Sequence, residues 1–252
     1  MADVGWCSGA QATLMLANLM PGPAGEVGPL IAAEGPGLVV TDLSKTYPKS
    51  TKPLFTGLSF SMERQGRLAL LGRNGQGKST LIKILGGVLP PSDGTIDWRM
   101  SVSWPIGFGG GFQGSLTGID NVQFLARLYN RPFRDLLERV DDFAELGAAL
   151  RQPVKHYSSG MRARLAFGLS LAIEFDSYLI DEVVAVGDAR FQKKCEEELF
   201  GRRGDRALMM ASHDTNLIGR HCDRALIIES GKAKMFDDIE EALDIYTWLR
   251  AV

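Results

Sequence analysis

The chain has 252 residues, of which 45% are hydrophobic and 23% are charged, and its formal net charge is −2. This composition is typical of a soluble globular protein with one large domain or two small ones, and it does not indicate a nucleic-acid-binding surface. No apolar run approaches the roughly 18–20 residues that a membrane-spanning helix requires.

Residues 1–37 differ in composition from the rest of the chain. No Lys or Arg occurs before Lys45, and prolines and glycines are frequent. The apolar run 12–20 is short and has no basic residue before it, so it makes a poor signal peptide. We expect residues 1–37 to form a disordered extension. The alternative is that the natural start of the protein lies downstream of this stretch.

From Leu38 onward, apolar alternation and helical spacing indicate strands that alternate with helices. Strands are expected at residues 38–43, 58–62, 68–71, 94–98, 177–180, 207–211 and 225–229. Helices are expected at residues 80–85, 119–129, 133–146 and 160–173, with an amphipathic helix before Val252. Such alternation predicts an α/β fold with a largely parallel sheet.

The segment from Leu71 to Thr80 reads Leu-Gly-Arg-Asn-Gly-Gln-Gly-Lys-Ser-Thr, the pattern G-x-x-x-x-G-K-[ST] of a phosphate-binding loop. An apolar strand precedes it and a helical pattern follows it, which is the context that the motif requires. The glycines let backbone N–H groups point at phosphate oxygens. Lys78 is expected to neutralise the β- and γ-phosphates, and Ser79 is expected to bind Mg²⁺.

Asp181 and Glu182 end a second apolar strand, so they are expected at the edge of the sheet where α/β proteins bind ligands. Asp181 can reach a metal ion through its water shell. Glu182 can polarise a water molecule for in-line attack on the γ-phosphate. His213 follows a third strand and is expected to contact the γ-phosphate. His156 and His221 have no such context, and we interpret them as structural.

Together with Tyr157-Ser158-Ser159-Gly160-Met161 and Ala211-Ser212-His213-Asp214, these motifs make the chain resemble the ATP-binding subunits of ABC transporters from about Leu38 onward. The resemblance implies a P-loop NTPase core with a mostly parallel sheet, an antiparallel β subdomain and a helical signature subdomain at roughly 114–174. By it, residues 38–252 form one ABC ATP-binding domain that uses ATP and Mg²⁺.

The resemblance also assigns a role to each matching residue. Glu182, His213 and Lys78 are the expected catalytic residues. ATP is expected to contact Tyr47, as the adenine-stacking aromatic, and the Walker A residues Gly72, Arg73, Asn74, Gly75, Gln76, Gly77, Lys78, Ser79 and Thr80. The Mg²⁺ ligands are Ser79, Gln113 of the Q-loop and Asp181 of Walker B. Asp188 lies in the D-loop. Ser158, Ser159, Gly160 and Met161 form the signature, which acts on the nucleotide held by the opposite subunit.

Departures from the commonest ABC pattern indicate one subclass within the family. Tyr157, Ser159 and Met161 are unusual in the signature, Val183 replaces a proline after Glu182, and the Q-loop is short. Residues 104–118 and 181–191 resemble the bacterial capsular polysaccharide exporters, whose close relatives export O-antigen and teichoic acid. The resemblance therefore implies export of a cell-surface polysaccharide, with the capsule type favoured. O-antigen, teichoic acid or another substrate is the alternative, and a non-transport ABC ATPase is a weaker one.

This resemblance also implies partners and a location. The expected partners are a second copy of the chain and an integral membrane permease, with no nucleic acid. Residues 107–121 are expected to contact the permease. The expected location is the cytoplasmic face of the bacterial inner membrane.

The three cysteines, Cys7, Cys195 and Cys222, match no disulfide or zinc spacing and fit a reducing cytoplasm.

Deletion of residues 1–36 is predicted to leave ATPase activity unchanged and to shift Tm by less than about 2 °C, because that stretch lacks the pattern of a core-forming segment. Thermal melts and phosphate release of the full and shortened chains check this. A fall in Tm of several degrees would show that the stretch packs on the domain.

Overall fold

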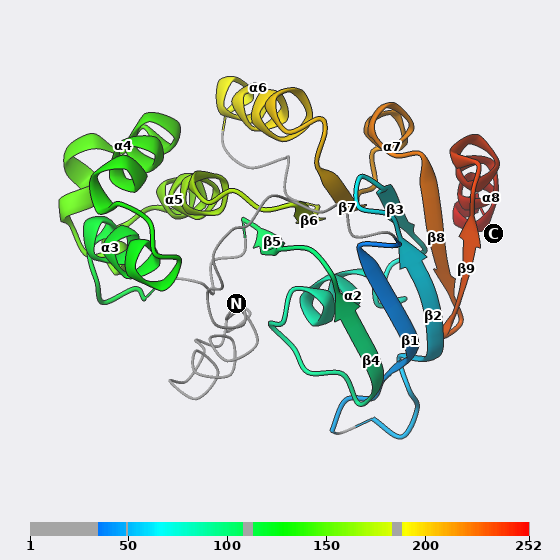
Figure 1. The fold of residues 1–252 in the computed structure, drawn as a ribbon. Coiled ribbons are helices and arrows are strands. Elements are labelled where there is room, and N and C mark those ends of the chain that lie inside the picture. The colour runs from blue at the N-terminus through cyan, green and yellow to red at the C-terminus, as the bar shows by residue number, and fades with distance from the viewer. Residues whose placement is uncertain (1–34, 49, 108–112, 183–187, 252) are drawn as a thin grey trace. The chain divides into compact units, whose positions relative to one another are not determined.

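A computed structural model describes residues 35–48, 50–107, 113–182 and 188–251 (Figure 1). The expected extension at residues 1–37 lies outside the described residues, apart from 35–37. Val183 and the residues that follow it up to 187 also lie outside them, as does the stretch 108–112 of the segment expected to contact the permease.

The chain divides into two compact units, which are taken in turn. Of the described residues, one unit contains 106–107, 113–174 and 188–204, and the other contains 35–105, 175–182 and 205–251. The expected helical segment 114–174 lies in the first unit. The helix that follows Asp188 belongs to the same unit, although the sequence did not indicate it.

The second unit contains a three-stranded antiparallel sheet in the order β2-β1-β4 (Figure 1). Its strands are β1 (Leu38–Lys45), β2 (Phe55–Met62) and β4 (Asp93–Trp98). Residues Leu38, Val40 and Leu43 of β1 are buried, and the register shifts between Val40 and Leu43. The shift is a bulge that lets both Val40 and Leu43 face the core despite their odd spacing.

The same unit contains a six-stranded sheet in the order β5-β6-β7-β3-β8-β9. Its strands are β3 (Arg67–Leu71), β5 (Val102–Ile106), β6 (Ser177–Asp181), β7 (Ala207–Ala211), β8 (Arg224–Glu229) and β9 (Lys232–Phe236). Strand β3 pairs in parallel with β7 and β8, and β6 pairs in parallel with β7. The predicted largely parallel α/β sheet is therefore confirmed, while β9 adds an antiparallel edge.

One hydrophobic core joins the two sheets of this unit. It contains alternate residues of the central strands, such as Leu68 and Leu70 on β3 and Leu226 and Ile228 on β8. These meet buried residues of β1 and β2 and of helix α2 (Lys78–Leu85). The parallel strands of the larger sheet are buried along almost their whole length, as expected for a sheet that is covered on both faces.

Two further helices belong to this unit, α7 (Thr215–His221) and α8 (Ile239–Ala251). Helix α8 contacts α7 and the strands β8 and β9, and it buries Ala242 and Tyr246. Asp214 accepts hydrogen bonds from the N–H groups of Asn216 and Leu217, so it caps α7.

The first unit is helical. Its elements are α3 (Gly118–Leu128), α4 (Phe133–Ala144), the 3₁₀ helices η2 (Gly147–Arg151) and η3 (Val154–His156), α5 (Ser159–Ala172), α6 (Ala189–Glu196) and the π-helix η5 (Glu197–Arg202). Thr117 and Asp120 form a capping box at the start of α3. The predicted helices at 119–129, 133–146 and 160–173 are confirmed, with each boundary within two residues.

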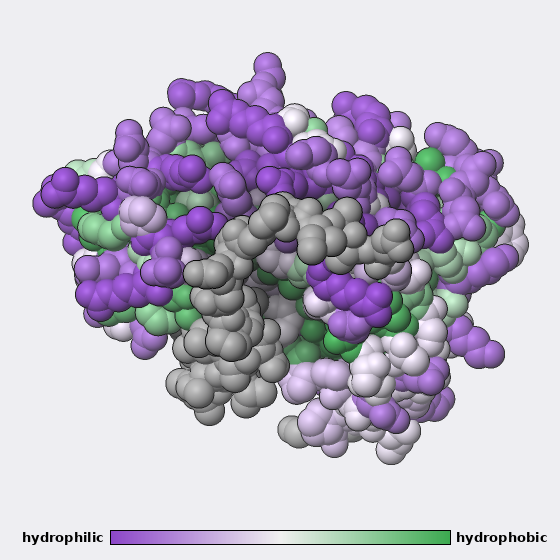
Figure 2. Space-filling view, viewed as in Figure 1, coloured by the Kyte–Doolittle hydropathy of each residue, from purple (hydrophilic) through white to green (hydrophobic). Residues whose placement is uncertain are grey.

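Hydrophilic side chains predominate on the surface over α4 and α6 in the view of Figure 2. Within the described part of the chain, no helix is long and apolar enough to cross a membrane.

The two cysteines in the described part of the chain, Cys195 and Cys222, are buried free thiols. Burial raises the pKa of each to about 12, so both stay protonated and unreactive at neutral pH.

Gly118→Ala is predicted to destabilise the helical unit by roughly 1–3 kcal/mol, as overpacking does. A Cβ at Gly118 would lie 2.8 Å from both the Tyr157 hydroxyl and Leu150 Cδ2. Thermal melts check this. The matched control is Gly201→Ala in the same unit, where a Cβ would meet nothing within 4 Å. Equal Tm values for the two variants would contradict the prediction.

Candidate functional site

Strand β3 ends at Leu71, and the next six residues form a loop that leads directly into α2. Gly72, Gly75 and Gly77 have φ angles of 148°, 83° and 102°. A Cβ at Gly72 would lie 2.3 Å from the carbonyl oxygen of Ile228, so this position admits only glycine. The loop and the N-terminus of α2 present backbone N–H groups in the manner of an anion site.

Lys78 is the first residue of α2, and its side chain folds back over the loop. The ammonium Nζ donates to the carbonyl oxygens of Gly72 (2.7 Å) and Arg73 (3.2 Å). Burial lowers the pKa of Lys78, and the negative charges of Glu182 and Asp181 oppose that shift. The loop thus holds a buried cation whose charge is favoured by two carboxylates, which is suited to neutralising phosphate charge.

Two of the predicted ATP-contacting residues use their side chains to bind the end of β8 and the residue that follows it. Arg73 Nη2 forms an ion pair with Glu229 Oε1 at 2.5 Å. The N–H of Ser230 donates to Gln76 Oε1 at 2.9 Å. Arg73 and Gln76 therefore brace the loop with their side chains.

Asp181 is the last residue of β6 and lies beside Ser79 of α2. The Ser79 hydroxyl donates to Asp181 Oδ1 at 2.8 Å, although the two residues are far apart in sequence. Burial raises the pKa of Asp181, and the Ser79 hydrogen bond opposes that shift. A hydroxyl and a carboxylate are hard oxygen donors, which fit Mg²⁺ because that ion keeps water and phosphate as its other ligands.

Within the described ranges, no group of three or more His, Cys, Asp or Glu side chains is arranged to hold a metal ion. The pair of Ser79 and Asp181 is thus a site that a nucleotide would have to complete with its phosphate oxygens.

Glu182 follows Asp181 and has a φ of 55°. Its N–H donates to the carbonyl oxygen of Ala211, the last residue of β7, at 2.9 Å. A left-handed glutamate costs free energy, and such strain is common at functional sites. The Oε1 atom of Glu182 lies 2.9 Å from Nε2 of His213.

Tyr47 lies next to the same loop. Its ring is exposed, and its hydroxyl lies 3.0 Å from Thr80 Oγ1. The ammonium of Lys45 lies 5.6 Å from the ring centroid. An exposed aromatic ring anchored beside a phosphate loop is a platform on which a nucleobase can stack.

In the helical unit, the predicted signature residues begin α5. Ser158 is the N-cap, and its hydroxyl accepts the N–H of Met161 at 3.2 Å. Tyr157 is buried, and its hydroxyl donates to the carbonyl oxygen of Ala149 at 2.6 Å. Tyr157 thus anchors the segment, while Ser158 and Ser159 are exposed.

Gln113 lies in the helical unit and is exposed. Its backbone N–H donates to Asn121 Oδ1 at 2.8 Å, and its carbonyl oxygen accepts from Asn121 Nδ2 at 3.2 Å. These bonds fix its backbone. Its assignment as a metal ligand stays a prediction, because Ser79 and Asp181 belong to the other unit.

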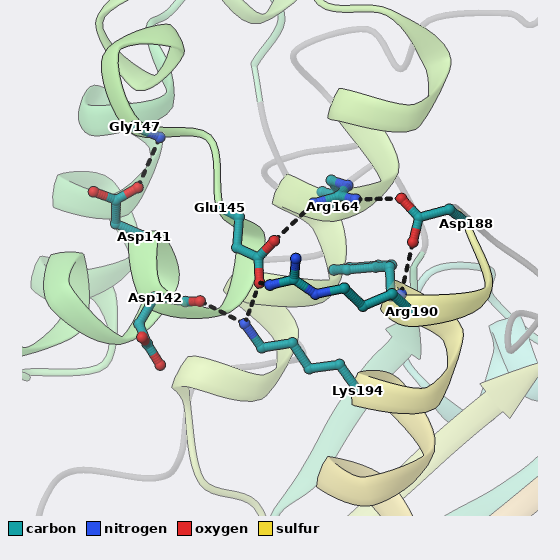
Figure 3. A network of polar contacts seen from close by, with 9 residues as sticks. Asp141, Asp142, Glu145, Gly147, Arg164, Asp188, Arg190 and Lys194 are labelled. Atoms are coloured by element: carbon teal, nitrogen blue, oxygen red, sulfur yellow. Dashed lines mark hydrogen bonds and ion pairs between the residues drawn. The ribbon is translucent and has the colours of Figure 1, made fainter.

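Asp188 of the predicted D-loop is part of a polar network in the helical unit (Figure 3). Its Oδ1 accepts the N–H of Phe191 and caps α6, and its Oδ2 pairs with Arg164 of α5 at 2.9 Å. Glu145, which ends α4 with a φ of 54°, accepts from Arg164, Arg190 and Lys194. The Lys194 bond is the main cause that lowers the pKa of Glu145. The network ties the signature helix to the residues after the D-loop.

Comparisons with known proteins identify a class of ATP-binding proteins, in agreement with the phosphate-binding loop of the site. A family model described as "ABC transporter" matches residues 55–185. The capsule polysaccharide export ATP-binding protein CtrD of Neisseria meningitidis serogroup B is 48% identical over 212 residues, which cover 83% of this chain and 98% of that protein. The ATP-binding protein BexA of Haemophilus influenzae is 47% identical over 82% of this chain and 96% of its own length.

Solved structures agree on the fold. An ATP-binding subunit of an ABC transporter superimposes with a TM-score of 0.69 at 22% identity, covering 85% of this chain and 95% of that one. The ATP-binding cassette MJ0796, a dimer bound to ADP and Pi in a post-hydrolysis state, superimposes with a TM-score of 0.65 at 17% identity, covering 79% and 98%.

The chain therefore belongs to the ABC transporter family of ATP-binding proteins, and it is an ATPase. The predicted resemblance and the predicted P-loop ABC ATPase fold are confirmed.

Tyr47→Ala is predicted to weaken ATP binding by about 1–3 kcal/mol, the usual value of a base stacked on an aromatic ring, with little change in kcat. Tyr47→Phe is the matched control: it loses the hydroxyl contact with Thr80 but keeps the ring, so it should bind ATP nearly normally. Titration with ATP and with inorganic triphosphate checks this. Equal loss of affinity for both ligands would contradict a stacking role.

Proposed function

We propose that the protein is the ATP-hydrolysing subunit of a transporter that exports a cell-surface polysaccharide, with a capsule polysaccharide favoured over O-antigen, teichoic acid or another substrate. The carrying observation is the 48% identity with a capsule polysaccharide export protein over nearly the whole of that protein. The segments 104–118 and 181–191, which depart from the commonest ABC pattern, support the same subclass.

In this proposal, Glu182 is the general base of ATP hydrolysis. Its carboxylate accepts a proton from the attacking water as that water approaches the γ-phosphorus in line with the leaving β–γ bridging oxygen. The backbone bond from Glu182 to Ala211 O fixes where the side chain begins. His213 is within 2.9 Å of Glu182, and Lys78 offsets the negative charge of the transferred phosphoryl group.

Ser79 and Asp181 would hold Mg²⁺, with Gln113 as a further ligand. When bound, the ion would supply positive charge that offsets the negative charge of the phosphate oxygens. A hydrogen bond already aligns Ser79 Oγ with Asp181 Oδ1, so these two oxygen donors lie together before the nucleotide arrives.

We infer that the working form is a homodimer, in which the signature of one copy contacts the nucleotide of the other. Gly160 supports this. Among the described residues outside its own stretch of helix, the nearest atom to a Cβ at Gly160 would be Ser158 Oγ at 3.9 Å, and its φ is not in the left-handed region. The described part of the chain therefore does not require glycine here, so its small size fits the close approach of another molecule. The dimeric cassette among the structural relatives offers the precedent.

A membrane permease is the remaining partner, since export needs a transmembrane path and no described helix can provide one. The permease would hold the protein at the cytoplasmic face of the bacterial inner membrane, with residues 107–121 as a contact. The net charge of −2 gives no support for nucleic acid as a partner.

Glu182→Gln is predicted to lower steady-state hydrolysis by about 10²–10⁴-fold, the usual contribution of a general base, while ATP still binds and stabilises the dimer. Phosphate release and light scattering with ATP check this. Glu174→Gln is the control, because Glu174 is an exposed acid paired with Arg139. Near-normal turnover of the Glu182 variant would remove the assigned role.

The export function is tested in cells. A strain that lacks the protein should retain polysaccharide inside the cell, and the wild-type gene, but not the Glu182→Gln variant, should restore it to the surface. Normal surface polysaccharide in the deletion strain would overturn the export proposal and leave the ATPase activity intact.

A further inference from the structure

Helix α8 places a buried tyrosine against the proposed catalytic pair. Tyr246 is 1% exposed, and its hydroxyl lies 3.0 Å from Nδ1 of His213. The other ring nitrogen of His213, Nε2, lies 2.9 Å from Glu182 Oε1. The imidazole is thus held at both nitrogens, by α8 on one side and by the residue after β6 on the other.

The two contacts together determine where the proton of a neutral imidazole resides. An ionised carboxylate can only accept hydrogen bonds, so the contact with Glu182 requires the proton on Nε2. A neutral ring has one N–H, which leaves Nδ1 as an acceptor. The Tyr246 hydroxyl must then donate to Nδ1. Tyr246 thus donates to His213, and His213 donates to Glu182.

Tyr246 is suited to donate without moving. Helix α8 packs against α7, β8 and β9 within one compact unit, so the tyrosine ring is fixed by the fold. The guanidinium of Arg250, one turn further along α8, lies 5.5 Å from the ring centroid and covers it. Burial raises the pKa of Tyr246, so the hydroxyl keeps its proton at neutral pH.

We propose that Tyr246 is a positioning residue for ATP hydrolysis: its hydroxyl holds His213 in the Nε2–H tautomer and directs that N–H to Glu182 and to the terminal phosphate. This inference rests on the proposed roles of His213 and Glu182. It assigns α8 a part in the chemistry, although none of the nucleotide-binding motifs includes that helix.

A positioning role and a purely structural role of Tyr246 predict different effects on the His213 ring. If Tyr246 only fills the core, removal of its hydroxyl alters stability and leaves the histidine ring unchanged. If Tyr246 positions His213, removal of the hydroxyl takes away the donor to Nδ1, so the Nε2–H tautomer is favoured only by the Glu182 contact and the population of the Nδ1–H tautomer rises.

The direct test is ¹⁵N NMR of the full chain labelled at histidine, which has only three histidines. His213→Gln identifies the His213 signals. In the wild-type protein with a neutral ring, His213 should show a protonated Nε2 and an unprotonated Nδ1. In Tyr246→Phe, the two nitrogen shifts should move towards each other. An Nδ1–H tautomer in the wild type, or unchanged shifts in the variant, would overturn the proposal.

Kinetics give the second readout. Tyr246→Phe should lower kcat about fivefold, the effect of one lost hydrogen bond, and leave KM for ATP unchanged. Tyr178→Phe is the matched control. Its hydroxyl is also buried and accepts the N–H of Phe175 at 3.2 Å, away from His213, so its kcat should stay at the wild-type value. Equal kcat values for the two phenylalanine variants would contradict positioning.

A double variant separates this inference from the proposed function. In the His213→Gln background, Tyr246→Phe should cause no further loss of kcat, since the two residues act as one unit. Additive losses would show that Tyr246 acts independently of His213. Full activity of His213→Gln alone would overturn the catalytic role of His213 itself.

Discussion

Parallel pairing of β6, β7 and β3 is the constraint on which the nucleotide site depends. In the β6–β7 register Asp181 lies opposite Ala211, and in the β3–β7 register Leu70 lies opposite Ala211. The phosphate loop, Glu182 and His213 therefore all begin within a few residues of one row across the sheet. A slip of one residue in any of these pairs would separate the groups.

Strain and tight packing are concentrated at this edge. Gly72 has no room for a Cβ beside Ile228, and Glu182 adopts a left-handed conformation that a glutamate rarely occupies. The buried core shared by α2 and the two sheets contains Leu70 and Leu81 on either side of the phosphate loop, so it holds both ends of that strained loop. The braces from Arg73 to Glu229 and from Gln76 to Ser230 do the same at the outer side of the loop.

Much of this could be predicted from the sequence, because apolar strands that end in phosphate-loop glycines or acids carry both pattern and motif. The strands at 68–71, 177–180 and 207–211 were predicted within one residue. Strand β5 was missed because Pro105 argues against a strand, although it is tolerated at the edge of a sheet. Strand β9 was missed because Lys232 and Lys234 leave it little apolar character. Tyr246 was missed because a buried tyrosine in an amphipathic helix has the pattern of any core residue.

The two units differ in what their polar groups achieve. In the unit with the nucleotide site, partly buried groups such as Lys78 and Asp181 have pKa values shifted by desolvation, so a bound nucleotide finds charges that water screens weakly. In the helical unit, the network around Glu145 is exposed enough for water to screen its charges. Its ion pairs therefore add little to the free energy of unfolding, and they chiefly fix the positions of the side chains that they join. Arg164 pairs with both Glu145 and Asp188, which joins the helix that begins at Ser158 to the cap of α6. The predicted signature and the predicted D-loop residue Asp188 thus share Arg164 as one anchor inside one unit.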